Sequence, residues 1–290
     1  DNQTFFHYIS KFNSISAVNM DKIIEILKNF KKDELKIIIN ARTRTGEDVM
    51  MSFAKSGNMI AIEYISKIVD NFYNKDIFGD NILHKILNGR AATNDSVFQG
   101  IAQICKKNPE LIIQRNRKGE NPFMIAATKG FNGVLGLMST YYPIKILDSS
   151  PKKSILHLAA LNNHPRTVSY IVQNLHVDVN IKANNGSTPL HFAAESSSIQ
   201  AYYELISLGG NPLIKDENGM TALDYAFKMG SVKMIRKIMN SPTFNLVLSS
   251  PEILFHLSKN VEAYPIFIHV ISLFDESVIN AVDSNGMNLI

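Results

Sequence analysis

A glycine recurs along this chain about every 33 residues, and that period limits the possible folds more than any other feature. Taking Gly186 as the reference, the equivalent positions are Gly46, Gly79, Gly119, Lys152, Gly219 and Gly286. Successive gaps are 33, 40, 33, 34, 33 and 67 residues, and the last spans two periods with one degenerate unit between them. Fixed periods of about 20 to 50 residues are typical of repeat architectures, in which each unit packs only on its neighbours. We therefore expect an array of similar units.

Within one unit, the residues around the glycine predict a turn followed by a helix. Asn185-Gly186 tolerates positive φ in a tight turn. Thr188 can cap the first free N–H groups of a helix, and Pro189 suits the first helical position. Eleven residues after the turn, a second glycine recurs at Gly57, Gly130 and Gly230. A glycine there can end the first helix in the left-handed conformation, so that a second helix can follow.

The best copy of this pattern resembles the ankyrin repeat family. It reads Asn185-Gly186-Ser187-Thr188-Pro189-Leu190-His191-Phe192-Ala193-Ala194, and Leu208-Gly209-Gly210-Asn211-Pro212 matches the closing turn of the family. Weaker copies extend the resemblance over nearly the whole chain, and it is specific between about residues 115 and 230. The resemblance implies an all-α solenoid of helix pairs with short hairpin fingers. About eight units are visible, counting degenerate and truncated ones.

We expect one continuous array over residues 1–290, because no composition break and no Pro/Gly/Ser-rich linker divides the chain. Its units are anchored near residues 2, 46, 79, 119, 152, 186, 219 and 251, with a cut one at 286. The unit at 79 is seven residues longer than the period, and the polar stretch 88–96 is the predicted surface loop. The chain lacks an initiator Met and neither end reads as a polar cap, so we expect it to belong to a longer protein.

The histidines of this chain do not predict a catalytic or metal site. His84, His157 and His191 occupy one position of the repeat motif, and we expect His7 to occupy it too. In that position the resemblance implies a structural imidazole that hydrogen-bonds between hairpin and helix. Histidines one repeat apart are also too far apart to share a zinc ion. We interpret these histidines as structural and predict no metal.

No motif in the sequence supports catalysis. Cys105 lies in an amphipathic run and is expected to be a small buried apolar residue, because no His or Asp is tied to it by a recognised spacing. The sequence holds no Gly-rich phosphate loop, no zinc-protease helix and no nucleophile elbow. We therefore predict no catalytic residues, no cofactor and no enzymatic activity in this chain.

Composition indicates a folded protein without a membrane span. Hydrophobic residues make up 45% and charged residues 19% of the chain, as in globular proteins. No apolar run reaches the roughly 18 residues that a membrane span needs. The single cysteine fits a reducing compartment. We therefore expect a cytoplasmic protein, or one in a host cytosol if it is a secreted effector.

The uneven distribution of charge predicts a binding face. Residues 1–153 carry 22 Lys/Arg and 15 Asp/Glu, whereas residues 154–290 carry 8 and 11. The resemblance implies that a partner binds the hairpin tips and the exposed ends of the first helices. The candidate partner-binding residues at these positions are Arg44, Lys55, Ile77, Phe78, Arg117, Lys118, Lys129, Lys153 and Leu161. We predict that their cations form one basic stripe, with Ile77 and Phe78 as its apolar anchor, since apolar tips without a partner are unusual. The alternative is that these charges only solvate the surface.

These observations leave three functions open. The first is a protein-interaction scaffold without catalysis, whose partner is another protein with an acidic surface. The second is a targeting segment of a larger enzyme, toxin, channel or secreted host-directed effector, whose activity lies outside this chain. Nucleic-acid binding by the basic half is disfavoured, because the acidic half would repel the phosphates. We expect a monomer.

Overall fold

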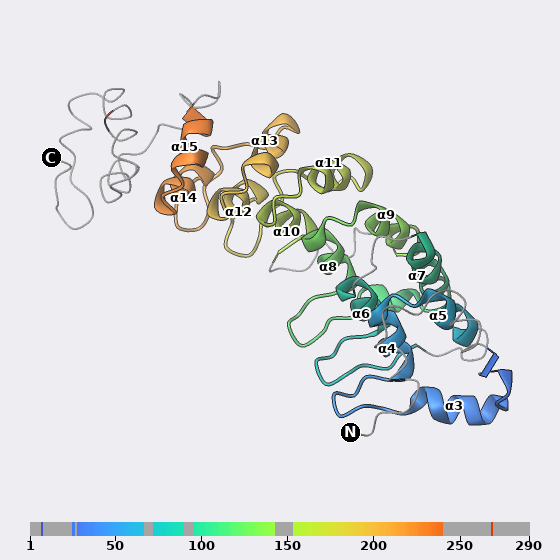
Figure 1. The fold of residues 1–290 in the computed structure, drawn as a ribbon. Coiled ribbons are helices and arrows are strands. Elements are labelled where there is room, and N and C mark those ends of the chain that lie inside the picture. Colours follow the sequence, from blue (N-terminus) through green and yellow to red (C-terminus); the bar gives the residue numbers. More distant parts are fainter. Residues whose placement is uncertain are drawn as a thin grey trace. The chain divides into compact units, whose positions relative to one another are not determined.

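The computed structural model describes residue 7 and residues 25–26, 28–66, 72–89, 95–142, 153–239 and 268. Over these residues it contains thirteen α-helices, α3 to α15, one 3-10 helix, η1, and no strand (Figure 1). The prediction of an all-α fold is therefore confirmed for the described part of the chain. The units predicted near 2, 251 and 286, the turn at 152 and residues 90–94 of the predicted loop lie outside these ranges.

Contacts within the chain divide it into two compact units, each considered by itself. Unit 1 comprises residues 1–127 and 131–147. Its described elements are α3 (Lys32–Asn40), α4 (Val49–Ser56), α5 (Met59–Ser66), α6 (Ile82–Asn88), α7 (Asp95–Lys107), η1 (Pro109–Ile112), most of α8 (Pro122–Lys129) and α9 (Asn132–Tyr141). Helix α4 packs on α6, while α5 packs on α7 and α7 on α9. The first and second helices of successive repeats thus form an inner and an outer row.

Unit 2 comprises residues 128–130 and 148–290. Its described helices are α10 (Ile155–Leu161), α11 (Pro165–Asn174), α12 (Pro189–Glu195), α13 (Ile199–Ser207), α14 (Ala222–Lys228) and α15 (Val232–Met239). The inner helices α10, α12 and α14 stack in order, and the outer helix α11 packs on α13. Each inner helix also contacts its own outer helix. Unit 2 therefore repeats the two-row packing of unit 1.

Helix α12 shows how the sequence builds an inner helix. Thr188 is the N-cap residue, with an extended backbone, and Pro189 opens the helix, as predicted. Ala193 and Ala194 are fully buried. Because these side chains are small, neighbouring helices can lie close on both sides, and α12 contacts both α10 and α14. The short alanine face is therefore the local reason for the stacking.

The turn glycines have the conformation that the period predicts. Gly46, Gly79, Gly119, Gly186 and Gly219 all have φ between 74° and 79°. The glycines eleven residues later, at 57, 130 and 230, are also left-handed. Asn163 and Ser197 occupy this second position in two repeats of unit 2 and keep the left-handed backbone, each with φ 56°. The sequence did not predict these two residues, because neither is a glycine.

A buried histidine links three helix starts to the following hairpin. In His84, His157 and His191, Nδ1 accepts a hydrogen bond from the backbone N–H of the N-cap residue, at 3.0–3.2 Å. Nε2 of the same ring lies 2.9–3.0 Å from a backbone carbonyl oxygen of the next hairpin. His7 Nε2 lies 3.2 Å from the Glu47 carbonyl oxygen. The predicted structural role is confirmed for His84, His157 and His191, and His7 makes the same bond to the following hairpin.

Burial and hydrogen bonding favour the neutral form of these rings. A carbonyl oxygen only accepts and a backbone N–H only donates, so the tautomer with its hydrogen on Nε2 satisfies both partners. Burial lowers the pKa of His84 and His191, and it lowers the pKa of His157 to about 4. In His157 and His191 a second proton on Nδ1 would face the N–H of the helix cap. Protonation therefore opposes the capped structure.

Candidate protein-binding surface

The hairpin tips of unit 1 are joined by backbone hydrogen bonds. Ile77 N donates to the Thr45 carbonyl oxygen at 3.0 Å, and Arg117 N donates to the Phe78 carbonyl oxygen at 2.8 Å. A Cβ atom at Gly79 would lie 3.1 Å from Arg117 N, which is closer than most real contacts. Glycine therefore permits the close approach as well as the turn. Three successive tips are held in register as a ladder.

Each hairpin is also braced from inside by its first side chain. Asp76 Oδ1 accepts hydrogen bonds from the backbone N–H groups of Phe78 and Asp80, each at 2.8 Å. Asn116 Oδ1 makes the same pair of bonds in the next hairpin, each at 3.0 Å. Side-chain bonds of this kind fix the shape of a turn without help from a partner. These bonds therefore define the shape of the two turns.

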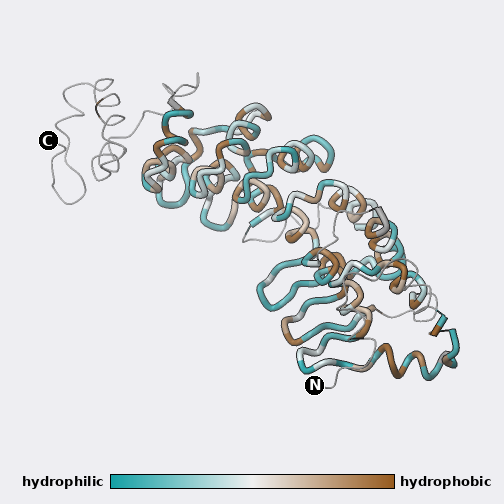
Figure 2. Tube along the Cα trace, in the orientation of Figure 1, coloured by the Kyte–Doolittle hydropathy of each residue, from teal (hydrophilic) through white to brown (hydrophobic). Residues whose placement is uncertain are grey.

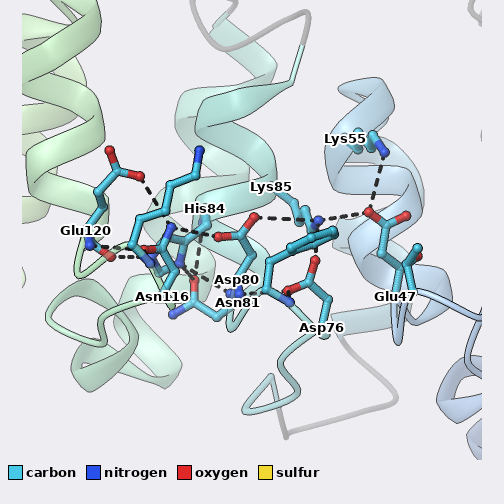
Figure 3. Close-up of polar contacts among 12 residues, drawn as sticks. Glu47, Lys55, Asp76, Asp80, Asn81, His84, Lys85, Asn116 and Glu120 are labelled. Carbon is cyan, nitrogen blue, oxygen red and sulfur yellow. Dashed lines mark hydrogen bonds and ion pairs between the residues drawn. The ribbon is translucent and has the colours of Figure 1, made fainter.

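A buried lysine ties the first two hairpins together (Figure 3). Lys85 Nζ lies 2.6 Å from Asp76 Oδ2, 2.8 Å from Glu47 Oε1 and 3.6 Å from Asp80 Oδ2. Burial alone would lower the pKa of Lys85, but hydrogen bonds to Asp76 and Glu47 outweigh it and raise the pKa. Burial likewise opposes ionisation of Glu47, yet its bonds to Lys85 and Lys55 lower its pKa. Lys85 and Glu47 therefore both favour the charged state in the folded protein.

The same network continues to the third hairpin. Asn116 Nδ2 donates to Asp80 Oδ1 at 2.9 Å, and His84 Nε2 donates to the Glu120 carbonyl oxygen at 2.9 Å. Figure 3 shows these groups as one chain of contacts between the hairpins and α6. The polar groups are therefore bonded to one another, and they hold the tips in front of them in place.

An apolar pair stands on the middle tip of this ladder. Ile77 is 44% exposed and Phe78 is 56% exposed. In Figure 2 the tip of the hairpin that precedes α6 is brown and its arms are teal, whereas the hairpin that precedes α8 is teal. Large apolar side chains are rarely grouped on an exposed, rigid turn unless something covers them. Ile77 and Phe78 are thus two adjacent exposed apolar residues on one tip of the ladder.

The structure places the predicted partner-binding residues in both units. Six of them lie in unit 1, and all six are exposed: Arg44, Lys55, Ile77, Phe78, Arg117 and Lys118. The other three lie in unit 2, where Lys153 is exposed and Lys129 and Leu161 are half-buried. Lys153 Nζ lies 4.8 Å from the ring centroid of Phe192. The ladder brings the residues of the three tips of unit 1 together, and the single stripe through all six cations stays a prediction.

Sequence reasoning missed Lys85 and the carboxylates around it. The Lys85–Glu47 pair joins residues 38 positions apart, and no short motif marks such a pair. The side chains of Glu47 and Asp80 are each 14% exposed, whereas that of Lys55 is 63% exposed. The positions of charges in the sequence do not show that the side chain of Lys55 is exposed while the carboxylates of Glu47 and Asp80 are largely buried.

The described residues offer little for metal or thiol chemistry. No group of three or more His, Cys, Asp or Glu side chains in the described ranges is arranged to hold a metal ion. Cys105 is fully buried, as predicted, and burial raises the pKa of its thiol to about 12. No helix in the described part of the chain is both long and apolar enough to cross a membrane.

Comparison with known proteins agrees with this geometry. Residues 156–247 match the family model of ankyrin repeats in three copies. The chain is 22% identical over 151 residues to the yeast protein "Target of rapamycin complex 2 subunit AVO2" from Saccharomyces cerevisiae, covering 50% of this chain and 35% of that protein. It is 22% identical over 227 residues to "Putative ankyrin repeat protein FPV022" of Fowlpox virus, covering 76% and 36%.

A human channel is also similar. "Transient receptor potential cation channel subfamily A member 1" is 27% identical over 171 residues, covering 58% of this chain and 15% of the channel. The chain thus spans about a third or less of the length of these relatives. Ankyrin repeats generally mediate protein–protein interaction. The periodic turns, the paired helices and these matches agree, and residues 156–247 of the chain are ankyrin repeats.

Proposed function

We propose that this chain is a protein-interaction scaffold without catalysis of its own, which binds a partner on the hairpin tips and inner-helix ends of unit 1. The observation that carries the proposal is the exposed Ile77–Phe78 pair on a braced tip. Because the backbone bonds of the ladder already fix this tip, binding would cost little ordering entropy. A partner that covers both side chains would also remove apolar surface from water.

The charges around this pair favour a partner with an acidic surface. Arg117 and Lys118 are exposed on the next tip, and Arg44 is exposed on the preceding one. The nearest carboxylates are recessed and bonded to Lys85 or Asn116. An approaching protein would therefore meet the cations first. Complementary charge mainly raises the association rate and the specificity of such a contact.

Capture from an extract of the cells that make the protein, followed by quantitative mass spectrometry, tests the proposal. The variant is Ile77→Asp with Phe78→Asp. The matched control is Leu213→Asp with Met229→Asp, which changes two exposed apolar residues of unit 2, 42% and 54% exposed. We expect the tip variant to lose a partner that the wild type and the control retain. Equal recovery from all three proteins would refute this binding face.

A second candidate is that the array is the targeting segment of a longer enzyme, toxin, channel or secreted effector. Some similar proteins have enzyme or channel names, and the chain covers 13% of "Palmitoyltransferase AKR1" of Lachancea kluyveri and 15% of the human channel. The proposed contact would then bring an activity encoded elsewhere in the polypeptide to the partner protein. The intact mass of the native protein tests this candidate, and a mass equal to that of the 290 residues would exclude it.

We also propose that residues 1–290 behave as one continuous array, monomeric and cytoplasmic. The repeat period that runs across both units supports a continuous array. The single buried cysteine is compatible with a reducing compartment. Size-exclusion chromatography with light scattering tests the monomer, and cell fractionation tests the compartment. Two separate unfolding transitions for the two units would contradict a single cooperative array.

A further inference from the structure

We propose that the ligand of the unit 1 tips is an extended peptide with one apolar side chain and a carboxylate about three residues away on each side. The inference rests on the proposed function and adds the chemistry and the register of the partner. It follows from the order of the tips, their separation and the accessibility of their charges.

The order of side chains along the ladder is cation, apolar pair, cation. Ile77 N bonds to Thr45, next to Arg44, on the preceding tip. Phe78 O accepts from Arg117 on the following tip. A chain that crosses the tips along the stacking direction therefore passes an arginine, then the apolar pair, and then a second arginine with its neighbouring lysine.

The separation of the tips sets the register of the ligand. Packed helices lie about 8–10 Å apart, and the inner helices α4 and α6, which pack on each other, follow the first two tips. An extended chain advances about 3.3 Å per residue. Ligand residues that face neighbouring tips are therefore about three positions apart. A carboxylate at this spacing on both sides of an apolar residue would meet a cation on each flank.

The accessible charges on the tips determine which charge the ligand should carry. Glu47 and Asp76 are bonded to Lys85, and their side chains are 14% and 0% exposed, so a basic ligand would meet carboxylates that are recessed and already paired. The exposed groups of the outer tips include Arg117 and Lys118. Single-stranded nucleic acid is a weaker fit, because it stacks successive bases on aromatic rings and the three tips carry only Phe78.

The inference is tested with fluorescein-labelled synthetic peptides of eleven residues in a glycine–serine background. The first peptide has a central leucine with an aspartate three positions away on each side. The second has the same composition with both aspartates next to the leucine, and the third has lysines in place of the aspartates. Fluorescence anisotropy with the full chain at low salt gives each affinity. A single-stranded DNA oligonucleotide serves as a different polyanion.

We expect the first peptide to bind about three- to tenfold more tightly than the second, as two exposed ion pairs allow. The third peptide should bind least. In the variant Arg117→Glu with Lys118→Glu the order of the first and third peptides should reverse. The matched control, Lys182→Glu with Lys215→Glu, changes two exposed lysines of unit 2 and should keep the wild-type order.

Three outcomes would overturn the inference. The first is equal binding of the first two peptides, or no binding of either up to about 1 mM. The second is an unchanged order in the charge-reversed variant, and the third is tighter binding of the oligonucleotide than of any peptide. The proposed function fails separately, when the Ile77→Asp and Phe78→Asp changes leave partner capture intact. If that variant loses its partner but the peptides show no preference, the proposed scaffold function stands. Only the spacing proposed for the peptide ligand is then rejected.

Discussion

Lys85 Nζ lies 2.6 Å from Asp76 Oδ2, and both side chains are buried at the base of the hairpin tips. The lysine reaches from α6 back to the hairpin before it and, through Glu47, to the hairpin before that. Removing one partner from a buried ion pair leaves an uncompensated charge, which costs far more than the pair contributes. The first two hairpins are therefore joined through one ammonium group in addition to their backbone hydrogen bond.

We predict that Lys85→Met lowers the free energy of unfolding by about 3–5 kcal/mol, because Glu47 and Asp76 are left buried without their cation. Urea titration followed by circular dichroism measures the change. Lys55→Met is the control, since its ammonium group is exposed and its pairing with Glu47 should contribute less than about 1 kcal/mol. Adding Asp76→Asn to Lys85→Met should recover part of the loss. Equal effects of the two lysine changes would contradict this account.

Acid should destabilise the repeats before the carboxylates are protonated. The pKa of His157 is about 4 in the folded chain and about 6.5 when unfolded, so the unfolded chain binds more protons between these values. The contribution of neutral His157 to the free energy of unfolding is complete above pH 6.5 and is lost as the pH falls toward 4. This histidine alone should account for a loss on the order of 3 kcal/mol.

Urea titrations at pH 7, 5.5 and 4.5 check this prediction. His157→Gln should flatten the dependence, because glutamine at the third helical position can cap the helix and does not titrate. His84 and His191 shift in the same direction and would keep a smaller slope in that variant. An unfolding free energy that stays constant between pH 7 and 4.5 would rule out the neutral-histidine caps.

The left-handed positions between helices should respond in opposite directions to glycine and alanine. Ser197→Gly should raise the free energy of unfolding by about 0.5–1 kcal/mol, since a non-glycine residue is strained at φ 56°. Gly130→Ala should lower it by about 1–3 kcal/mol, because its Cβ would also lie 2.9 Å from His164 Nδ1. Thermal denaturation of both variants measures the effects.

Asn163→Gly should not raise the free energy of unfolding as Ser197→Gly does, although both residues have φ 56°. Its Oδ1 accepts a hydrogen bond at 3.1 Å from Ala201 N, in the first turn of α13 in the next repeat. Asn163→Gly would relieve the strain but remove this cap, which is typically worth about 1 kcal/mol. We expect no gain in stability. A gain as large as that of Ser197→Gly would show that the cap contributes nothing.

The Cys105 thiol should report unfolding. It is fully buried, and the pKa of about 12 leaves almost no thiolate near neutral pH. We expect Ellman's reagent to react slowly with the native chain and quickly in urea, with the same midpoint as circular dichroism. Cys105→Ala should abolish the signal, because the chain has one cysteine. Fast modification without urea would place the thiol in an open region.

Periodicity predicted the turns and the buried histidines well, because a positive φ selects glycine and the repeat position fixes what each imidazole meets. Asn163 and Ser197 escaped prediction because their backbone is imposed by the packing of two helices rather than by their own preference. The Lys85 network escaped it because its members meet only after three hairpins stack. Ile77 and Phe78 could be singled out in sequence, since apolar residues at tip positions break the pattern of the other copies.

The histidine bridges also give the array a direction. Every described bridge runs forward, from an imidazole to a carbonyl of the following repeat, so the two faces of a unit are chemically unequal. Asp224 stands in the same position in the next unit, and its buried Oδ1 has no hydrogen-bond partner among the described residues. A carboxylate cannot donate to a carbonyl as the imidazole does. Units therefore cannot be shuffled freely. A cut after a histidine-bearing unit removes the carbonyl that accepts from its imidazole, whereas a cut before that unit removes the donor to its own hairpin carbonyl.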